Sequence, residues 1–446
     1  MERSQKQSRR RFKTWQIILA LLLFLLVLLH LSGSYKVRKR VQALSDQGYP
    51  ITIEELEDSY TIPDGVPNAA DVYLAAFSHY REWDKPDMQA LHKARKPKRT
   101  ESLNSSARQL VEQFLSDNQK TVSLLHEAAS IEHCRYPIDF AQVYDSSDTR
   151  LDNIRSCSVL LLLDVLIQCE NEDSGKALAS IRANLALARS MNVPLLGFQL
   201  THIGMQSWTC GSIERILNRI SLGDEQLLTL SEWIKIPDIG EPFKRALMTE
   251  QCLGLHTLQA PIKDITKQTG HKGMLLMLVP WKMLGLCYRE TLTFIDLMQE
   301  SIDTMDLPDP ERLAAFDAVQ KSVHQGGRGG VLMHEFWLTH TRLLDIVIWY
   351  VAQLRAARTA LAVERYRLAE GRLPQSLDNL VPTYLSAIPD DPLDGTPLKY
   401  RLLQPGYVVY SVGEDLTDEG GTERGTQGRD ARNRPLPCDI TFIVER

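Results

Sequence analysis

The sequence lacks the short motifs that mark several enzyme classes. No serine stands in the G-x-S-x-G pattern of a nucleophile elbow, and no two cysteines form a C-x-x-C pair. His334 and His340 lie six residues apart, whereas the zinc helix H-E-x-x-H needs a spacing of four. On a helix, positions six apart point about 120° away from each other. These absences speak against a serine hydrolase of the elbow type, a cysteine-based metal framework and a zinc protease.

A strong charge of one sign is also missing. The chain has 51 Lys and Arg against 56 Asp and Glu, a formal net charge of −5 over 446 residues. A nearly neutral balance gives no reason to expect nucleic acid as a partner. The glycine run Gly326–Gly330 precedes an expected helix but lacks the Lys-Ser/Thr of a phosphate-binding loop, so 326–330 is interpreted as a hinge.

The seven cysteines are odd in number and widely dispersed. Most of them stand within apolar helical patterns, which is typical of small buried hydrophobic residues rather than of a disulfide framework. His133, Cys134 and Arg135 are consecutive, and neighbouring cations could lower the pKa of a thiol. A reactive Cys134 is therefore one hypothesis, although residues adjacent in sequence need not face each other in space.

The N-terminal region contains what the rest of the chain lacks, a long hydrophobic run. Thirteen apolar residues from Ile17 to Leu29, extended by Trp15 and Tyr35, give 21 residues, enough to cross about 30 Å of hydrocarbon. More basic residues precede the run than follow it, which favours a cytoplasmic N-terminus. We therefore expect a basic cytoplasmic segment at 1–14, a transmembrane helix at 15–35 that contacts membrane lipid, and an extracytoplasmic remainder. A cleaved signal peptide, with Ser32 and Ser34 near the cleavage site, is the alternative.

The middle of the chain is expected to be helical. Residues 36–104 are interpreted as a connecting segment with a polar, basic loop near its end, and 105–325 as a helical domain, either a bundle or an array of hairpins. Breaks are predicted near 170–174, 191–194, 221–224 and 236–242. The apolar stretch Met274–Leu286 is too short for a second membrane span and is interrupted by Pro280, so we expect a core helix there.

The last part of the chain, 331–446, is predicted to be a small α+β module. An apolar stripe that begins at Leu343 indicates a long helix to about Glu370, which Gly371 would end in a left-handed cap. Alternating runs at 398–403 and 407–412, with a further run at 439–444, predict an antiparallel sheet of about three strands. The expected fold class is thus mainly α, with an N-terminal transmembrane helix and this C-terminal module.

Three segments of the module, 360–385, 388–400 and 406–421, resemble the globular region of the major pseudopilin family of type II secretion systems. That family shares a helix ending in Tyr-x-x-x-x-Gly-x-x-Pro, an Asp-Pro turn followed by Gly-x-Pro, and a strand running into Ser-x-Gly-x-Asp. The matching residues here are Tyr366, Gly371, Pro374, Asp391, Pro392, Gly395, Pro397, Ser411, Gly413 and Asp415. The resemblance covers about a fifth of the chain. The whole arrangement resembles large bacterial envelope proteins of the planctomycete type, which implies the bacterial inner membrane as the location.

The resemblance also implies a possible calcium site in the acidic turn at 414–421. Asp415 matches the first acidic ligand position of the family, and Asp418 and Glu419 fall near the second. Calcium takes six to eight oxygen ligands, which carboxylates and carbonyls of such a turn can supply. Leu416 stands where the family has glycine. Pairing of these carboxylates with the arginines at 424, 429, 432 and 434, without a metal, is the alternative.

Two functional hypotheses follow. The chain lacks the glycine and glutamate of a pseudopilin leader, and about 300 residues separate its apolar run from the module, which speaks against assembly into a pilus. The first hypothesis is a non-enzymatic, membrane-anchored envelope protein that binds other proteins, associated with a secretion or pilus-like system. The alternative is an envelope hydrolase with an active site in the helical domain. Its candidate residues are His133, Cys134, Asp139, His256 and His334.

Overall fold

The computed structural model describes residues 2–94, 98–143, 149–234, 240–269, 275–325, 343–423 and 438–446. It confirms a mainly helical fold with an apolar N-terminal helix and a small C-terminal antiparallel sheet. The expected hinge at 326–330, His334, His340 and the four arginines after the acidic turn lie outside the described residues.

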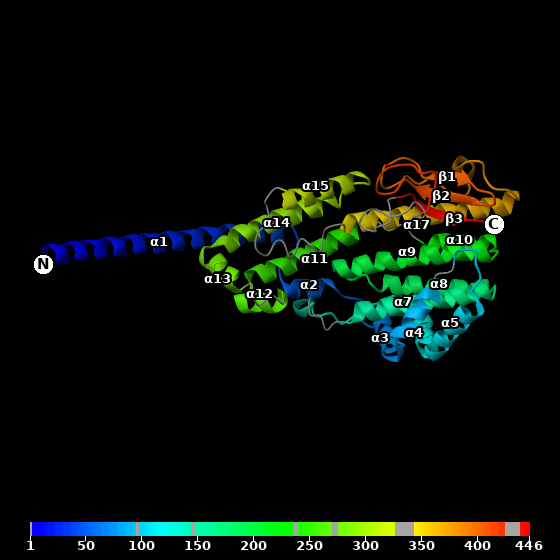
Figure 1. Cartoon of the computed structure of the whole chain (residues 1–446), viewed down its shortest axis with the longest axis horizontal. Helices are drawn as coiled ribbons and strands as arrows, with labels where there is room; N and C mark the ends of the chain where they lie inside the picture. The colour runs from blue at the N-terminus through cyan, green and yellow to red at the C-terminus, as the bar shows by residue number, and fades with distance from the viewer. Residues whose placement is uncertain are drawn as a thin grey trace.

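The first helix, α1 (Glu2–Asp46), projects from one end of the body (Figure 1). The helices of the body, in chain order, are α2 (Ile53–Ser59), α3 (Ala69–His79), α4 (Lys85–Ala94), α5 (Ser105–Asp117), α6 (Gln119–Ala128), α7 (Arg150–Glu170), α8 (Ser174–Arg189), α9 (Leu196–Arg219), α10 (Asp224–Trp233), α11 (Gly240–Gln259), α12 (Ile262–Thr269), α13 (Leu275–Met283), α14 (Leu286–Thr304), α15 (Glu311–Gln325) and α17 (Leu343–Glu370). The strands are β1 (Lys399–Leu402), β2 (Tyr407–Ser411) and β3 (Ile440–Val444).

Helix α1 is long and apolar enough to cross a membrane, and none of its most apolar window is buried by the rest of the protein. The helix continues without a break beyond the expected end at residue 35. Its last turns pack on α14, with Leu44 only 2% exposed and an ion pair of 3.1 Å between Arg40 and Asp296. The apolar helix and the body are therefore joined by one continuous helix rather than by a flexible linker.

The connecting segment folds into short helices with side-chain caps. Thr52 and Glu55 form a capping box at the start of α2, and the Asn68 side chain accepts the N–H of Ala70 at the start of α3. The predicted basic loop is in part helical, because α4 buries Leu91. Arg99 follows α4 and pairs with Glu214, Glu423 and Glu445.

The predicted helical breaks of the middle region are confirmed within a few residues: α8 follows a cap at Asp173, Pro194 stands before α9, and α10 follows Gly223. Helices α7 and α8 form the expected hairpin, and α9 packs against both. Four alanines of α8 and Ser180 are buried, which lets the three helices approach closely: Ala177, Ala183, Ala186 and Ala188. The result is a layered helical body rather than a regular array.

The expected core helix at 274–286 is only half buried. Helix α13 turns Leu278 and Trp281 inward, where the Trp281 indole N–H donates to Glu290 at 2.5 Å. Its other described apolar side chains are exposed. The core interpretation was therefore right for one face of the helix and wrong for the other.

In the C-terminal module, α17 lies between the sheet on one side and α9 and α10 on the other (Figure 1). Although α17 is also long and apolar enough to span a membrane, 67% of its apolar window is buried, which identifies a core helix. Gly371 ends it with φ +66°, as predicted. The strand order is β1-β2-β3, all antiparallel, with Ser411 paired to Ile440.

The free edge of β3 is covered by α9. Glu214 accepts the N–H of Ile443, and Asn218 both donates to the carbonyl of Ile443 and accepts the N–H of Glu445. Side chains four residues apart on one helix thus supply the hydrogen bonds that a neighbouring strand would make, so this edge is not open to further pairing.

Candidate ligand pocket and acidic turn

A pocket of about 1080 Å³ opens between the end of α1, α2, the segment 129–134 and one end each of α8, α9 and α11. Its walls combine apolar side chains such as Tyr73 and Phe243 with charged groups. The volume lies at the upper end of what small-molecule pockets offer, so the cavity can take a drug-sized ligand or a short peptide segment.

The charged groups of the wall are three arginines and two glutamates: Arg182, Arg189, Arg245, Glu55 and Glu132. One glutamate is already engaged, because Glu55 accepts the backbone N–H groups of Ile51 and Thr52. Three positive charges against two negative ones leave the wall with a small positive balance, which favours an anionic ligand.

Arg182 and Arg189 stand two turns apart on the same helix, about 10 Å along its axis. Within the described part of the chain, neither guanidinium has an ion pair or a hydrogen bond from its side chain. Burial lowers the pKa of Arg189, and the nearby positive charge of Arg182 lowers it further. Two guanidinium groups without carboxylate partners, in the wall of one cavity, form an unneutralised basic site.

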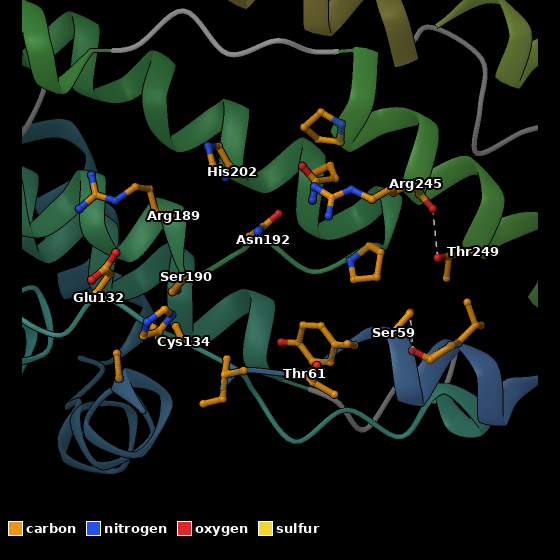
Figure 2. A pocket seen from close by; sticks show the side chains of 18 of the residues that line it. Ser59, Thr61, Glu132, Cys134, Arg189, Ser190, Asn192, His202, Arg245 and Thr249 are labelled. Atoms are coloured by element: carbon orange, nitrogen blue, oxygen red, sulfur yellow. Dashed lines mark hydrogen bonds between the residues drawn. The ribbon is translucent and has the colours of Figure 1, made fainter. Parts of the chain in front are cut away.

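Figure 2 shows Arg189, Glu132, Cys134 and Ser190 at one end of the pocket, with Arg245 toward the other end. Arg245 extends from α11 and is only loosely paired with Glu241, at 3.8 Å. A positive charge thus stands toward each end of the cavity, with His202 and Asn192 between them in Figure 2. This arrangement suits an elongated ligand with more than one negative group.

His202 belongs to the same wall but carries no charge at neutral pH. Burial, and then the charge of Arg189, lower its pKa to about 4. Its Nε2 lies 2.8 Å from the amide nitrogen of Gln206, which donates to it. Among the described residues, Nδ1 is buried without a partner. The imidazole is therefore neutral and adds no positive charge to the site.

Cys134 lies in the pocket, but its thiol is not activated. Burial raises the pKa of this thiol to about 12, despite hydrogen bonds with Tyr136 and Ser190 that act in the opposite direction. The adjacent arginine gives no help, because the Arg135 guanidinium lies over the Tyr60 ring at 5.2 Å and donates to the Tyr60 carbonyl. The hypothesis of a reactive thiol therefore loses its physical basis.

The residues of the hydrolase hypothesis do not come together. His133 and Cys134 line the pocket, whereas Asp139 accepts the N–H of Ala141 at the start of a short 3-10 helix. His256, on α11, lies outside the pocket wall, and His334 lies outside the described residues. The candidate residues that the structure describes thus do not form a nucleophile with a base beside it.

The three predicted calcium ligands are held in different ways. Asp415 accepts the N–H of Thr417, and Asp418 accepts the Tyr410 hydroxyl and the N–H of Gly420. Glu419 instead faces Asp439, which accepts the N–H groups of Gly421 and Thr422. In the described part of the chain, no three His, Cys, Asp or Glu side chains converge as a metal site.

Glu419 and Asp439 nevertheless keep one feature that fits a cation. Burial raises the pKa of both carboxyls, and their mutual proximity adds to it for Glu419. Glu419 Oε2 and Asp439 Oδ1 are buried and lack hydrogen-bond partners among the described groups. Either a proton shared between the two carboxyls or a bound calcium ion would give these oxygens the partner that they lack. Calcium remains a prediction, and Glu419 with Asp439 is the pair that would hold it.

Sequence reasoning missed Asp439 and the arginines of the pocket. Asp439 had a signal in the sequence, since pairing of Ser411 with Ile440 places Asp439 opposite Val412, next to the acidic turn. The sequence signal for Arg182 and Arg189 was weaker: two arginines seven residues apart on a helix that consists mainly of small and apolar residues. The remaining wall comes from distant segments and had no local signal.

Comparison of the chain with protein-family models, with curated proteins and with solved structures gives no match in any of the three.

Proposed function

We propose that this chain is a single-pass protein of a bacterial cell membrane, anchored by α1, whose extracytoplasmic body binds an acidic segment of another protein without catalysis. The observation that carries the binding role is the pair of unneutralised guanidiniums of Arg182 and Arg189 in the wall of the large pocket.

The size and the lining of the pocket support a peptide as ligand. Apolar side chains share the wall with the basic groups, so a segment with both acidic and apolar residues finds partners for each. Guanidinium groups bind carboxylates in a two-pronged geometry, and the side chains of Arg182 and Arg189 are both exposed, so a ligand can reach them.

The absence of catalysis is proposed for two chemical reasons. The Cys134 thiol stays protonated at neutral pH, and the Ser190 hydroxyl is held by Tyr136 and by the carbonyl of Leu187. A role as a pilus subunit is not proposed, because α17 is enclosed by the body and the sheet and offers no long free face for stacking.

Binding is tested with the full chain in nanodiscs of uncharged lipid, titrated with a fluorescent peptide of Glu and Leu and with a matched peptide of Lys and Leu. We expect saturable binding of the acidic peptide only. The double variant Arg182→Gln, Arg189→Gln should weaken it by at least about tenfold, the scale of one to two charge-assisted contacts. Arg372→Gln, at an exposed arginine outside the pocket, is the matched control.

Equal binding of the two peptides, or an unchanged affinity of the double variant, would refute the binding role. Displacement of the peptide by a small dicarboxylate at equal concentration would assign the site to a small anion instead. The anchor is tested separately in spheroplasts, where protease added from outside should digest the body and leave α1 with the membrane.

A further inference from the structure

Helix α13 exposes a group of large apolar side chains at the end of the body from which α1 emerges (Figure 1). Together with the turn that follows, it presents five of them between residues 277 and 286: Met277, Val279, Met283, Leu284 and Leu286. Their exposed fractions run from 40% to 67%. An apolar group of this kind on a soluble surface is unfavourable unless something covers it.

Three contacts fix the position of this group along α1. His30 Nε2 donates to the carbonyl of Met283 at 2.9 Å, and the His30 and Tyr288 rings meet edge to face at 5.5 Å. Gly33 lies directly against the Tyr288 ring, since a Cβ there would stand 2.7 Å from it. The end of α13 and the start of α14 therefore lie beside residues 30–33 of α1.

The length of the apolar run then determines how deep in the bilayer α13 would lie. The thirteen residues from Ile17 to Leu29 cover only about 20 Å, whereas the hydrocarbon core needs about 30 Å. The run can gain only residues 14–16 toward the N-terminus, because Lys13 and the arginines at 9–11 lie beyond them. A spanning α1 must therefore take residues 30–34 into the hydrocarbon margin, and Met283 and Leu284 go with them.

We propose that α13 is a second membrane contact, with the exposed face of 277–286 inserted into the outer leaflet beside α1. This inference rests on the proposed membrane anchor and adds the lipid acyl chains as the occupant of the α13 face. Lys36, Lys39 and Arg289 are exposed next to this level, where they meet the headgroups. The body is thereby held against the bilayer at two points.

The test is photolabelling of the full chain in liposomes by a phosphatidylcholine that carries a diazirine in its acyl chain, followed by peptide mapping. We expect label on α1 and on 277–286, and none on the exposed Leu402 and Leu416 at the other end of the body. Met283→Glu combined with Met277→Glu should reduce the α13 label several-fold and leave the α1 label unchanged. Leu402→Glu is the matched control and should change neither.

The outcomes separate the two proposals. Label on α1 without label on 277–286 would overturn the α13 contact and keep the anchor. If chemical crosslinks then joined 277–286 of two copies, the occupant would be a second chain. Absence of label from α1 as well would overturn the membrane anchor itself.

Discussion

Glu214 of α9 accepts the backbone N–H of Ile443 in β3 at 2.6 Å, so a carboxylate stands in for the neighbouring strand that this sheet edge lacks. Burial raises the pKa of Glu214 from its ordinary 4.5 to about 7, against the opposing effect of Arg99. The bond between helix and sheet is therefore sensitive to pH in the physiological range.

The first prediction concerns the pH dependence of unfolding. Because the folded-state pKa of this acid is raised, the folded state binds the proton more tightly, and stability falls as pH rises from about 4.5 to about 7. Glu214→Gln stays neutral and keeps an acceptor for Ile443. We expect the wild type to lose up to about 3 kcal/mol relative to this variant across that window. Thermal unfolding of both proteins in detergent at several pH values measures it, and parallel curves would contradict it.

The second prediction concerns calcium at Glu419 and Asp439. If the ion binds there, millimolar calcium raises the melting temperature of the full chain, because a ligand of the folded state stabilises it. Asp439→Asn should abolish the calcium effect and raise the melting temperature in chelator, since an amide can donate to the unpaired Glu419 oxygen.

Glu414→Gln, at an exposed acid of the same turn, is the control and should leave both effects in place. A wild type that is indifferent to calcium would remove the ion from this turn and leave a shared proton as the explanation for the raised pKa values of the two carboxyls.

The third prediction uses the backbone at Leu416. This residue has φ +57°, a left-handed conformation that costs a branched side chain about 1 to 2 kcal/mol. Its side chain is 58% exposed, so little packing is lost on its removal. Leu416→Gly should stabilise the chain by about 0.5 to 1 kcal/mol after the entropy of glycine is counted. Leu416→Ala keeps the strained backbone and should give no such gain in urea unfolding.

The fourth prediction concerns the reactivity of Cys134. A thiol with a pKa of about 12 has almost no thiolate at pH 7.4, so its alkylation by iodoacetamide in the folded protein should be at least tenfold slower than that of a free cysteine. Mass spectrometry of timed samples measures the rate. Labelling at the rate of a free thiol would restore the reactive-cysteine hypothesis, and Cys134→Ser gives the background.

Local patterns in the sequence predicted much of the fold, because the signals were themselves local. The stripe from Leu343 and the cap at Gly371 placed α17, and the alternating runs placed the three strands. At α13, hydrophobicity indicated a helix but could not tell which side of it would meet the core, since that depends on α14 packing beside it and on His30 of α1 at its end.

The candidate site was less predictable for a physical reason. Its walls come from segments as distant as Ser45 and Thr249, and a cavity leaves no periodicity in the sequence. The pKa values depend on burial too: the run His133-Cys134-Arg135 suggested a lowered thiol pKa, and the fold raises it by enclosing the sulfur and turning Arg135 toward Tyr60. Charged residues that are close in sequence change a neighbour's pKa as expected only where the fold also brings the charged groups close in space.

The unbroken course of α1 has a consequence for how far a partner must reach. Ser45, in the pocket wall, stands ten residues beyond Tyr35 on the same helix, a rise of about 15 Å. If α1 spans the bilayer, this continuous helix holds the pocket at a fixed, short distance above the lipid surface. If the proposed partner is a large folded protein, it must therefore reach the pocket with a tail or a protruding loop.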